Sequence, residues 1–337
     1  MLIASPDFAE WKWLASGQEI FYGTPFNYPY TGPPSRLDAI GVATSVKRTV
    51  VAPTSIGRII AYRFNVTRSQ IYFEQYNLPD GDVSLYRAPL TGTSLPEQVV
   101  VLRSADSLRR MVTVSPDERT VAWVEQRQEP LSWSVVTMDV ANGGQRVYPL
   151  KEFGDHVRWS PSGRSLVVEP ENAWSASGTP FQWVDRENGA VRLWLAPANE
   201  VTLESSRTFR WEGETPWLYT TVGGTVVRYS IATGSPEQLG VLPLMGAVVG
   251  WSPDLESVVV ATNECVRVGE GGCLRYASSV YRLELRSSRR TEILRHDGSG
   301  RIFGQLSPTG SWFAYAYSSC GGGCYAPGDG LYVVRVP

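Results

Sequence analysis

The sequence is poor in the residues that most often bind metal ions or carry proton-transfer chemistry at neutral pH. Its 337 residues include only two histidines, His156 and His296, which lie far apart in the chain. No His-x-x-Glu-His motif can therefore form, and no Gly-x-Ser-x-Gly nucleophile elbow occurs. Each histidine lies just before an expected strand, where a loop histidine hydrogen-bonded to the backbone is the ordinary interpretation. We expect no catalytic residues, no bound metal and no cofactor.

Long apolar runs and an excess of one charge are also absent. No stretch of about 18 apolar residues occurs, so no transmembrane helix is expected. The first residues, MLIASPDFAEWKW, lack a basic segment followed by an apolar one, and we expect no secretion signal there. The 31 basic and 33 acidic residues nearly balance, which argues against a nucleic-acid partner.

What the sequence does contain is a repeated unit, seen most clearly in HVRWSPSGRSLVV at residues 156–168. Two apolar runs flank a turn at residues 160–163, where proline and glycine favour chain reversal. The rule of an anchor residue followed seven positions later by an apolar residue is met seven times at blade-like spacing: Trp13 with Ile20, Phe64 with Ile71, Val114 with Val121, Trp159 with Leu166, Trp211 with Leu218, Trp251 with Val258, and Leu306 with Phe313.

This spacing predicts the fold. A period of about 40 to 50 residues is what a four-stranded propeller blade occupies. We therefore predict an all-β protein whose residues 1–337 form a single domain, a seven-bladed β-propeller. The last blade is one strand short, and residues 2–5 are placed to supply its outermost strand. Pairing of the two chain ends would close the ring and remove exposed sheet edges.

Four of the turns carry a shared motif, at residues 115–117, 160–163, 252–254 and 307–310. Each has Ser-Pro followed by Asp, Ser or Thr, and the chain there resembles the TolB-like, or PD40, repeat family of WD40-like propellers. Trp159 and Trp251 match the aromatic residue of that pattern, whereas Val114 and Leu306 replace it. The resemblance implies a propeller but no single activity, because such repeats serve translocation proteins, peptidase gating domains and binding modules.

Four cysteines lie in two expected loops between the second and third strands of blades 6 and 7. Cys265 and Cys273 flank one loop, and Cys320 and Cys324 flank the other. Their closeness in sequence favours disulfides 265–273 and 320–324, which would indicate a periplasmic or extracellular location. A zinc site of all four thiolates and free thiols are the alternatives.

Basic residues precede the anchor in four blades, namely Lys12, Arg63, Arg158 and Arg210. On innermost strands they would surround the central channel and form a funnel that attracts an anionic ligand. The alternative is that neighbours such as Glu10 and Glu212 neutralise them.

Aromatic residues are concentrated in the expected long loops of one face. Aromatic side chains supply contact area at little entropic cost and are enriched at protein interfaces. We therefore predict a partner-binding face, although each ring could instead pack on its own blade. The residues are Phe26, Tyr28, Tyr30, Tyr76, Trp174 and Tyr325.

From the sequence we expect a non-catalytic protein-binding or scaffolding propeller outside the cytoplasm, with a protein partner of unknown identity. Two alternatives stay open. One is a propeller lyase or hydrolase, or a binder, that acts on an anionic polymer such as a glycan through the basic funnel. The other is a permanent structural subunit of a cell-envelope assembly.

Overall fold

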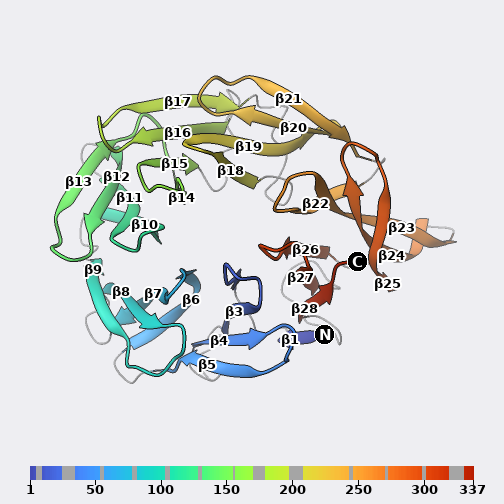
Figure 1. Ribbon diagram of the computed structural model, residues 1–337, viewed down its shortest axis with the longest axis horizontal. Helices are drawn as coiled ribbons and strands as arrows, with labels where there is room; N and C mark the ends of the chain where they lie inside the picture. Colours follow the sequence, from blue (N-terminus) through green and yellow to red (C-terminus); the bar gives the residue numbers. More distant parts are fainter. Residues whose placement is uncertain are drawn as a thin grey trace.

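The structure is a computed structural model of the chain and describes residues 1–4, 10–24, 35–53, 57–77, 82–102, 107–127, 131–154, 156–169, 179–196, 208–242, 246–269, 272–297, 301–318 and 330–337. These residues form 28 strands in seven four-stranded antiparallel sheets. The sheets surround a common centre as blades (Figure 1). The described residues contain no helix, and hence none long and apolar enough to cross a membrane. The predicted all-β, seven-bladed propeller is confirmed.

The strands follow the chain from the centre of each blade outward. Blades 1 to 3 contain β2 (Glu10–Trp13), β3 (Glu19–Thr24), β4 (Arg36–Gly41) and β5 (Lys47–Val51); β6 (Gly57–Val66), β7 (Gln70–Asn77), β8 (Val83–Pro89) and β9 (Glu97–Leu102); and β10 (Ser107–Val114), β11 (Thr120–Arg127), β12 (Ser132–Asp139) and β13 (Gln145–Pro149).

Blades 4 to 6 repeat this order. They contain β14 (His156–Trp159), β15 (Ser165–Glu169), β16 (Thr179–Asp185) and β17 (Val191–Ala196); β18 (Thr208–Glu212), β19 (Thr215–Val222), β20 (Thr225–Ser230) and β21 (Pro236–Val241); and β22 (Gly246–Trp251), β23 (Ser257–Gly269), β24 (Gly272–Glu284) and β25 (Arg290–Asp297).

Blade 7 joins the two ends of the chain. Its sheet order is β1 (Leu2–Ala4), β28 (Gly330–Arg335), β27 (Trp312–Ser318) and β26 (Arg301–Leu306). Leu2 pairs with Tyr332 and Ala4 with Leu331. The predicted closure by the N-terminal strand is confirmed, and Figure 1 shows the two termini near each other.

The core is divided among the interfaces between blades. Each of seven buried clusters joins two adjacent blades. Successive side chains of a strand point to opposite sides, so one strand serves two clusters: Phe21 packs against blade 2 and Tyr22 against blade 7. Burying one such ring stabilises the fold by roughly 1.5 to 3 kcal/mol, and each blade therefore depends on both neighbours.

The Ser-Pro turns share one hydrogen bond that explains their serine. Ser115, Ser160, Ser252 and Ser307 are at most 2% exposed. Each hydroxyl accepts the backbone amide five residues further on, at 2.9–3.1 Å. The buried hydroxyl thus completes the turn between the first and second strands.

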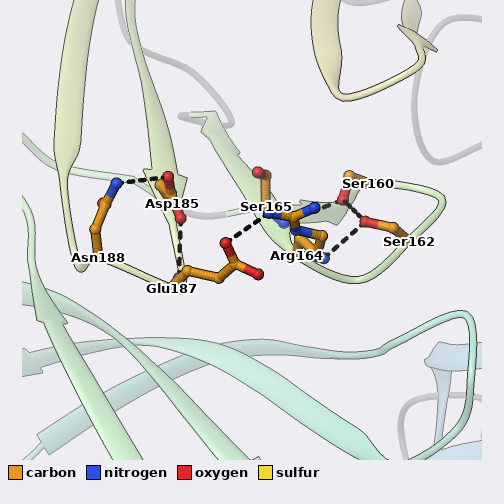
Figure 2. Close-up of polar contacts among 7 residues, drawn as sticks. All are labelled: Ser160, Ser162, Arg164, Ser165, Asp185, Glu187 and Asn188. Carbon is orange, nitrogen blue, oxygen red and sulfur yellow. Dashed lines mark hydrogen bonds and ion pairs between the residues drawn. The ribbon is translucent and has the colours of Figure 1, made fainter.

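Figure 2 shows how this turn is joined to the next one in blade 4. Arg164 follows the first turn and donates to Glu187 of the second at 2.5 Å. Asp185 accepts the amide of Glu187 at 2.9 Å and the side chain of Asn188 at 2.8 Å. Asp185 and Glu187 therefore stabilise turns.

Two of the seven hairpins differ from the repeat rule. The anchor pairs with the residue seven positions on in blades 1, 3, 4, 6 and 7. In blade 2 Ile71 pairs with Val66 and in blade 5 Leu218 pairs with Phe209. The cause is the turn between the first and second strands of the blade. The turns that follow Val66 and Glu212 are tighter than those of the other blades and lack Ser-Pro. The register therefore shifts by two residues in these blades.

Blade 6 corrects the prediction of a long loop between its second and third strands. β23 and β24 each run for 13 residues and stay paired to Gly269 and Gly272. Valine and tyrosine in this stretch favour extended backbone. Cys265 lies opposite Tyr276, and Cys273 lies opposite Val268.

Candidate functional site

Three of the four predicted funnel residues line one pocket of about 340 Å³ at the centre of blades 1 to 4. Its wall is supplied mainly by the innermost strands β2, β6, β10 and β14. Figure 1 shows β6, β10 and β14 near the centre of the ring. The polar lining residues are Glu10, Lys12, Arg63, Asn65, Glu74, Thr113, His156 and Arg158. Residues far apart in the chain meet here because each blade contributes the same strand.

Each cation of this pocket is paired with a carboxylate. Lys12 Nζ lies 3.3 Å from Glu10, and Arg63 lies 3.0 Å from Glu74. Arg158 Nε donates to Glu169 at 2.5 Å. The expectation that Glu10 neutralises Lys12 is thereby supported, and the pocket carries cations and carboxylates together.

The two arginine pairs are asymmetric in their exposure. The Glu74 and Glu169 side chains are 5% and 3% exposed, whereas those of Arg63 and Arg158 are 29% and 51% exposed. In both pairs the carboxylate therefore lies inside the protein and the guanidinium lies nearer to solvent. An anion that enters the pocket therefore meets the guanidinium groups before the carboxylates. Water screens these partly buried charges less than it screens ions in bulk solvent, so the attraction is stronger there.

Glu74 also fixes the geometry of the next blade. Its Oε1 accepts the amide of Val112 at 3.2 Å, and Asn65 donates to the Val112 carbonyl at 2.7 Å. The β10–β11 register shifts between Arg110 and Thr113. The irregular backbone of blade 3 is therefore held from blade 2.

On blade 4, His156 and Arg158 share one side of β14, and Glu169 lies on the same side of the adjacent strand β15. His156 pairs with Glu169 across the strands, and directly opposed side chains lie on the same face. The Arg158 guanidinium lies 5.4 Å from the centre of the Phe209 ring of blade 5. Glu169 and Phe209 thus fix Arg158, and His156 borders the same pocket.

Arg210, the fourth predicted funnel residue, does not line this pocket. The lining residues come from blades 1 to 4, and Arg210 belongs to blade 5. In blade 5, moreover, Phe209 pairs with Leu218 and so occupies the anchor position. Arg210 then falls one residue beyond the anchor instead of one before it. Glu212, expected to neutralise Arg210, instead forms an ion pair with Arg228.

The second histidine lies in a different interface. His296 of β25 stacks on Tyr317 with ring centres 4.5 Å apart, and its Nε2 is 3.0 Å from the Tyr315 hydroxyl. Burial lowers the pKa of His296, and burial together with Tyr332 raises the pKa of Tyr315 to about 12. His296 therefore joins blades 6 and 7 and is not a loop residue.

Most of the predicted partner-binding face lies outside the described residues, namely Phe26, Tyr28, Tyr30, Trp174 and Tyr325. Tyr76, at the end of β7, is 49% exposed. Cys320 and Cys324 also lie outside the described residues, as do the side chains of Cys265 and Cys273. The partner-binding face and both disulfides stay predictions.

Sequence reasoning missed the two buried carboxylates of the pocket. Glu74 and Glu169 each stand three residues after the apolar residue that the repeat rule selects, Ile71 and Leu166. The sequence did contain a signal for them. In QIYFEQ and SLVVEP a single acidic residue follows the apolar residues of the second strand. Buried carboxylates need partners, and a search for cations on the adjacent strand would have found Arg63 and Arg158.

No protein-family model matches the chain. A curated relative, the lasso peptide isopeptidase AtxE2 of Asticcacaulis excentricus, is 27% identical over 106 residues, which cover 28% of this chain and 15% of that protein. The chain thus spans a small part of that relative's length.

Among solved structures, an oligogalacturonate lyase in complex with manganese has a TM-score of 0.67 at 12% identity, over 100% of this chain and 92% of that one. An oligogalacturonate lyase from Vibrio parahaemolyticus has a TM-score of 0.67 at 11% identity, over 100% and 93%. A prolyl endopeptidase has a TM-score of 0.60 at 11% identity, over 94% of this chain and 47% of that one. At these identities the likeness shows the seven-bladed fold.

These comparisons correct the functional expectation. The proteins that share this architecture over nearly the whole chain include oligogalacturonate lyases, and the curated relative is an isopeptidase. The expectations of a non-catalytic scaffold and of no enzymatic activity are therefore wrong, and the comparisons favour the enzymatic alternative. The sequence argument failed because it equated few histidines with no catalysis, although arginine, lysine and carboxylate side chains can serve.

Proposed function

We propose that this chain is an enzymatic propeller that binds a carboxylated oligosaccharide in the pocket of blades 1 to 4 and cleaves it by elimination. The observation that carries the proposal is the convergence of Lys12, Arg63 and Arg158 on one pocket, where both arginines are more exposed than the carboxylates that pair with them. Guanidinium groups bind planar carboxylates well. The substrate class is suggested by the oligogalacturonate lyases that share the fold.

The pocket contains the groups that an elimination needs. Removal of a proton next to a sugar carboxylate places negative charge on that carboxylate, and fixed cations stabilise such charge as it develops. The proton leaves to a base, the bond to the leaving oxygen breaks, a carbon–carbon double bond forms, and the leaving oxygen takes up a proton from water. His156 and Glu10 line the pocket and are the groups able to accept the proton.

Manganese is bound by one of the similar lyases, but the residues that the structure describes in this chain do not fit such a site. The described residues hold no group of three or more histidine, cysteine or acidic side chains placed for a metal. Glu10 and Glu74 are paired with cations, and His296 lies in the interface of blades 6 and 7. We therefore assign the stabilisation of charge to the cations of the pocket.

The experiment is turnover of oligogalacturonate, followed by the ultraviolet absorbance of the unsaturated product. Lys12→Gln removes an exposed charge whose pairing contributes little to stability. We expect it to lower kcat/KM roughly tenfold, which corresponds to about 1.4 kcal/mol. Lys151→Gln, an exposed lysine away from the pocket, is the matched control. No product from the wild-type chain would overturn the proposal.

A second candidate function rests on the isopeptidase relative and the prolyl endopeptidase likeness. In that case the propeller is the substrate-admitting part of a peptide-hydrolysing protein, and its channel binds an acidic peptide. Binding of acidic peptides without turnover of oligogalacturonate would favour this candidate.

We also propose that the chain is a diverged member of the TolB-like repeat family. The support is the hydrogen bond shared by its four Ser-Pro turns. The proposal includes an extracytoplasmic location, supported by the spacing of the cysteine pairs.

A further inference from the structure

Arg210 occupies the wall between blades 5 and 6. It lies on β18, the innermost strand of its blade, opposite Trp217. Its neighbour Phe209 packs back against Phe181 of blade 4, with ring centres 5.3 Å apart. Because successive side chains alternate in direction, Arg210 points toward blade 6. Tyr219, on the same side of the sheet, contacts Trp251 of that blade with ring centres 5.4 Å apart.

Unlike the three cations of the pocket, Arg210 has no carboxylate partner among the residues that the structure describes. Within the described part of the chain no carboxylate oxygen lies within 4.0 Å of it. Its Nε is covered by protein and has no hydrogen-bond acceptor. Glu212, on the same side of the strand, accepts hydrogen bonds from Arg228 and from the Tyr219 hydroxyl. Glu212 is therefore already engaged with other partners.

An arginine in this setting lowers the stability of the folded chain. Burial lowers the pKa of Arg210, but a guanidinium stays protonated at neutral pH. Arg210 is partly buried, and a partly buried charge without a counter-charge is unfavourable. By contrast, Arg63 and Arg158 receive their counter-charges from Glu74 and Glu169.

We propose that Arg210 is a binding subsite whose counter-charge is a carboxylate group of the ligand, separate from the pocket of blades 1 to 4. The inference rests on the proposed function and deepens it, because it assigns a second acidic sugar unit to the wall between blades 5 and 6. The inference requires a ligand long enough to place one carboxylate in the pocket and another at Arg210.

The test compares Arg210→Met with the wild-type chain by thermal unfolding, alone and with oligogalacturonate. Without ligand, the variant should melt at or above the wild-type temperature because an uncompensated charge is removed. With ligand, its affinity should fall at least tenfold. Arg146→Met, an exposed arginine on β13 at the outer edge of blade 3, is the matched control and should keep both properties.

The outcomes separate this inference from the proposed function. A lower melting temperature for Arg210→Met without ligand would show an internal partner and overturn the inference. Unchanged affinity in Arg210→Met, with affinity lost in Lys12→Gln, would overturn the inference and leave the proposed function standing. An equal stabilisation by inorganic phosphate would overturn the assignment to carboxylate. Absence of any oligogalacturonate binding by the wild-type chain would overturn both.

Discussion

In the ion pairs at the pocket, stability and the proposed recognition of an anion depend on different members of each pair. In the pair of Arg158 and Glu169 the carboxylate is buried, and the guanidinium reaches the pocket. Removing the arginine leaves a buried negative charge, whereas replacing both members by neutral side chains does not. The two roles can therefore be measured separately.

Arg158→Gln should destabilise the fold by about 2 kcal/mol, because Glu169 loses the charge that compensates its burial. The expected loss of unfolding free energy is modest because the Arg158 side chain is half-exposed. The double variant with Glu169→Gln should recover most of this loss. Urea unfolding at neutral pH measures both, and a single variant as stable as the wild type would contradict the account.

The Ser-Pro turn of blade 6 should lose stability in acid because of Asp254. Hydrogen bonds from Ser252 and the Glu256 amide outweigh burial and hold the pKa of Asp254 below its ordinary value. The stabilisation is therefore present above an unfolded-state pKa of about 3.9 and is lost as the pH falls below it. We expect Asp254→Asn to be less stable than the wild type at pH 6 and the difference to shrink at pH 3. Urea midpoints at the two pH values check this, and a constant difference would contradict it.

At the scale of the element, the repeat turns do two tasks at once. Gly310 adopts φ +72°, and a Cβ there would lie 3.3 Å from Pro253 of the preceding blade. The glycine thus allows both the turn and the contact between blades. Gly143 adopts the same φ of +72° in a turn with nothing within 4 Å of the added atom.

The pair Gly310→Ala and Gly143→Ala therefore separates backbone strain from packing. Gly143→Ala should cost about 1 kcal/mol from the positive φ alone. Gly310→Ala should cost more, because Pro253 must also move. Denaturant unfolding of the two variants gives the difference, and equal losses would show that the contact contributes nothing.

The elements were predictable wherever the turn carried its own chemistry. Ser160, Pro161 and Gly163 mark a hairpin in the sequence, and the strands on either side followed correctly. Blades 2 and 5 lack that motif, and nothing in their sequence fixed the length of the turn. In blade 5 the two-residue shift places Arg210 one residue after the position that pairs with Leu218, not one residue before it. The site was thus predictable in its cations but not in the carboxylates Glu74 and Glu169, whose contacts depend on tertiary structure.

At the scale of the whole molecule, stability depends on closing the ring. β1 supplies the outer strand of blade 7, and Ile3 is 7% exposed within the cluster between blades 7 and 1. The other blades are continuous in sequence, so only this one joins the chain ends. A ring of mutually dependent blades should unfold as a unit.

Deleting residues 1–4 should therefore lower the melting temperature of the whole protein by several degrees and keep one transition. The physical reason is the exposed edge of β28 and the lost burial of Ile3. Differential scanning calorimetry measures this, with Leu2→Ser, at a half-exposed side chain, as the control. An unchanged melting curve after the deletion would show that the N-terminal strand does not close the ring.

The central claim is that the pocket of Lys12, Arg63 and Arg158 recognises sugar carboxylates and acts on the sugar that carries them. The most direct measurement is the rate of unsaturated product formation from oligogalacturonate and from its fully methyl-esterified form. Esterification removes the charge and keeps the sugar, so kcat/KM for the ester should be at least tenfold lower. Equal rates on both substrates, or no product from either, would contradict the account.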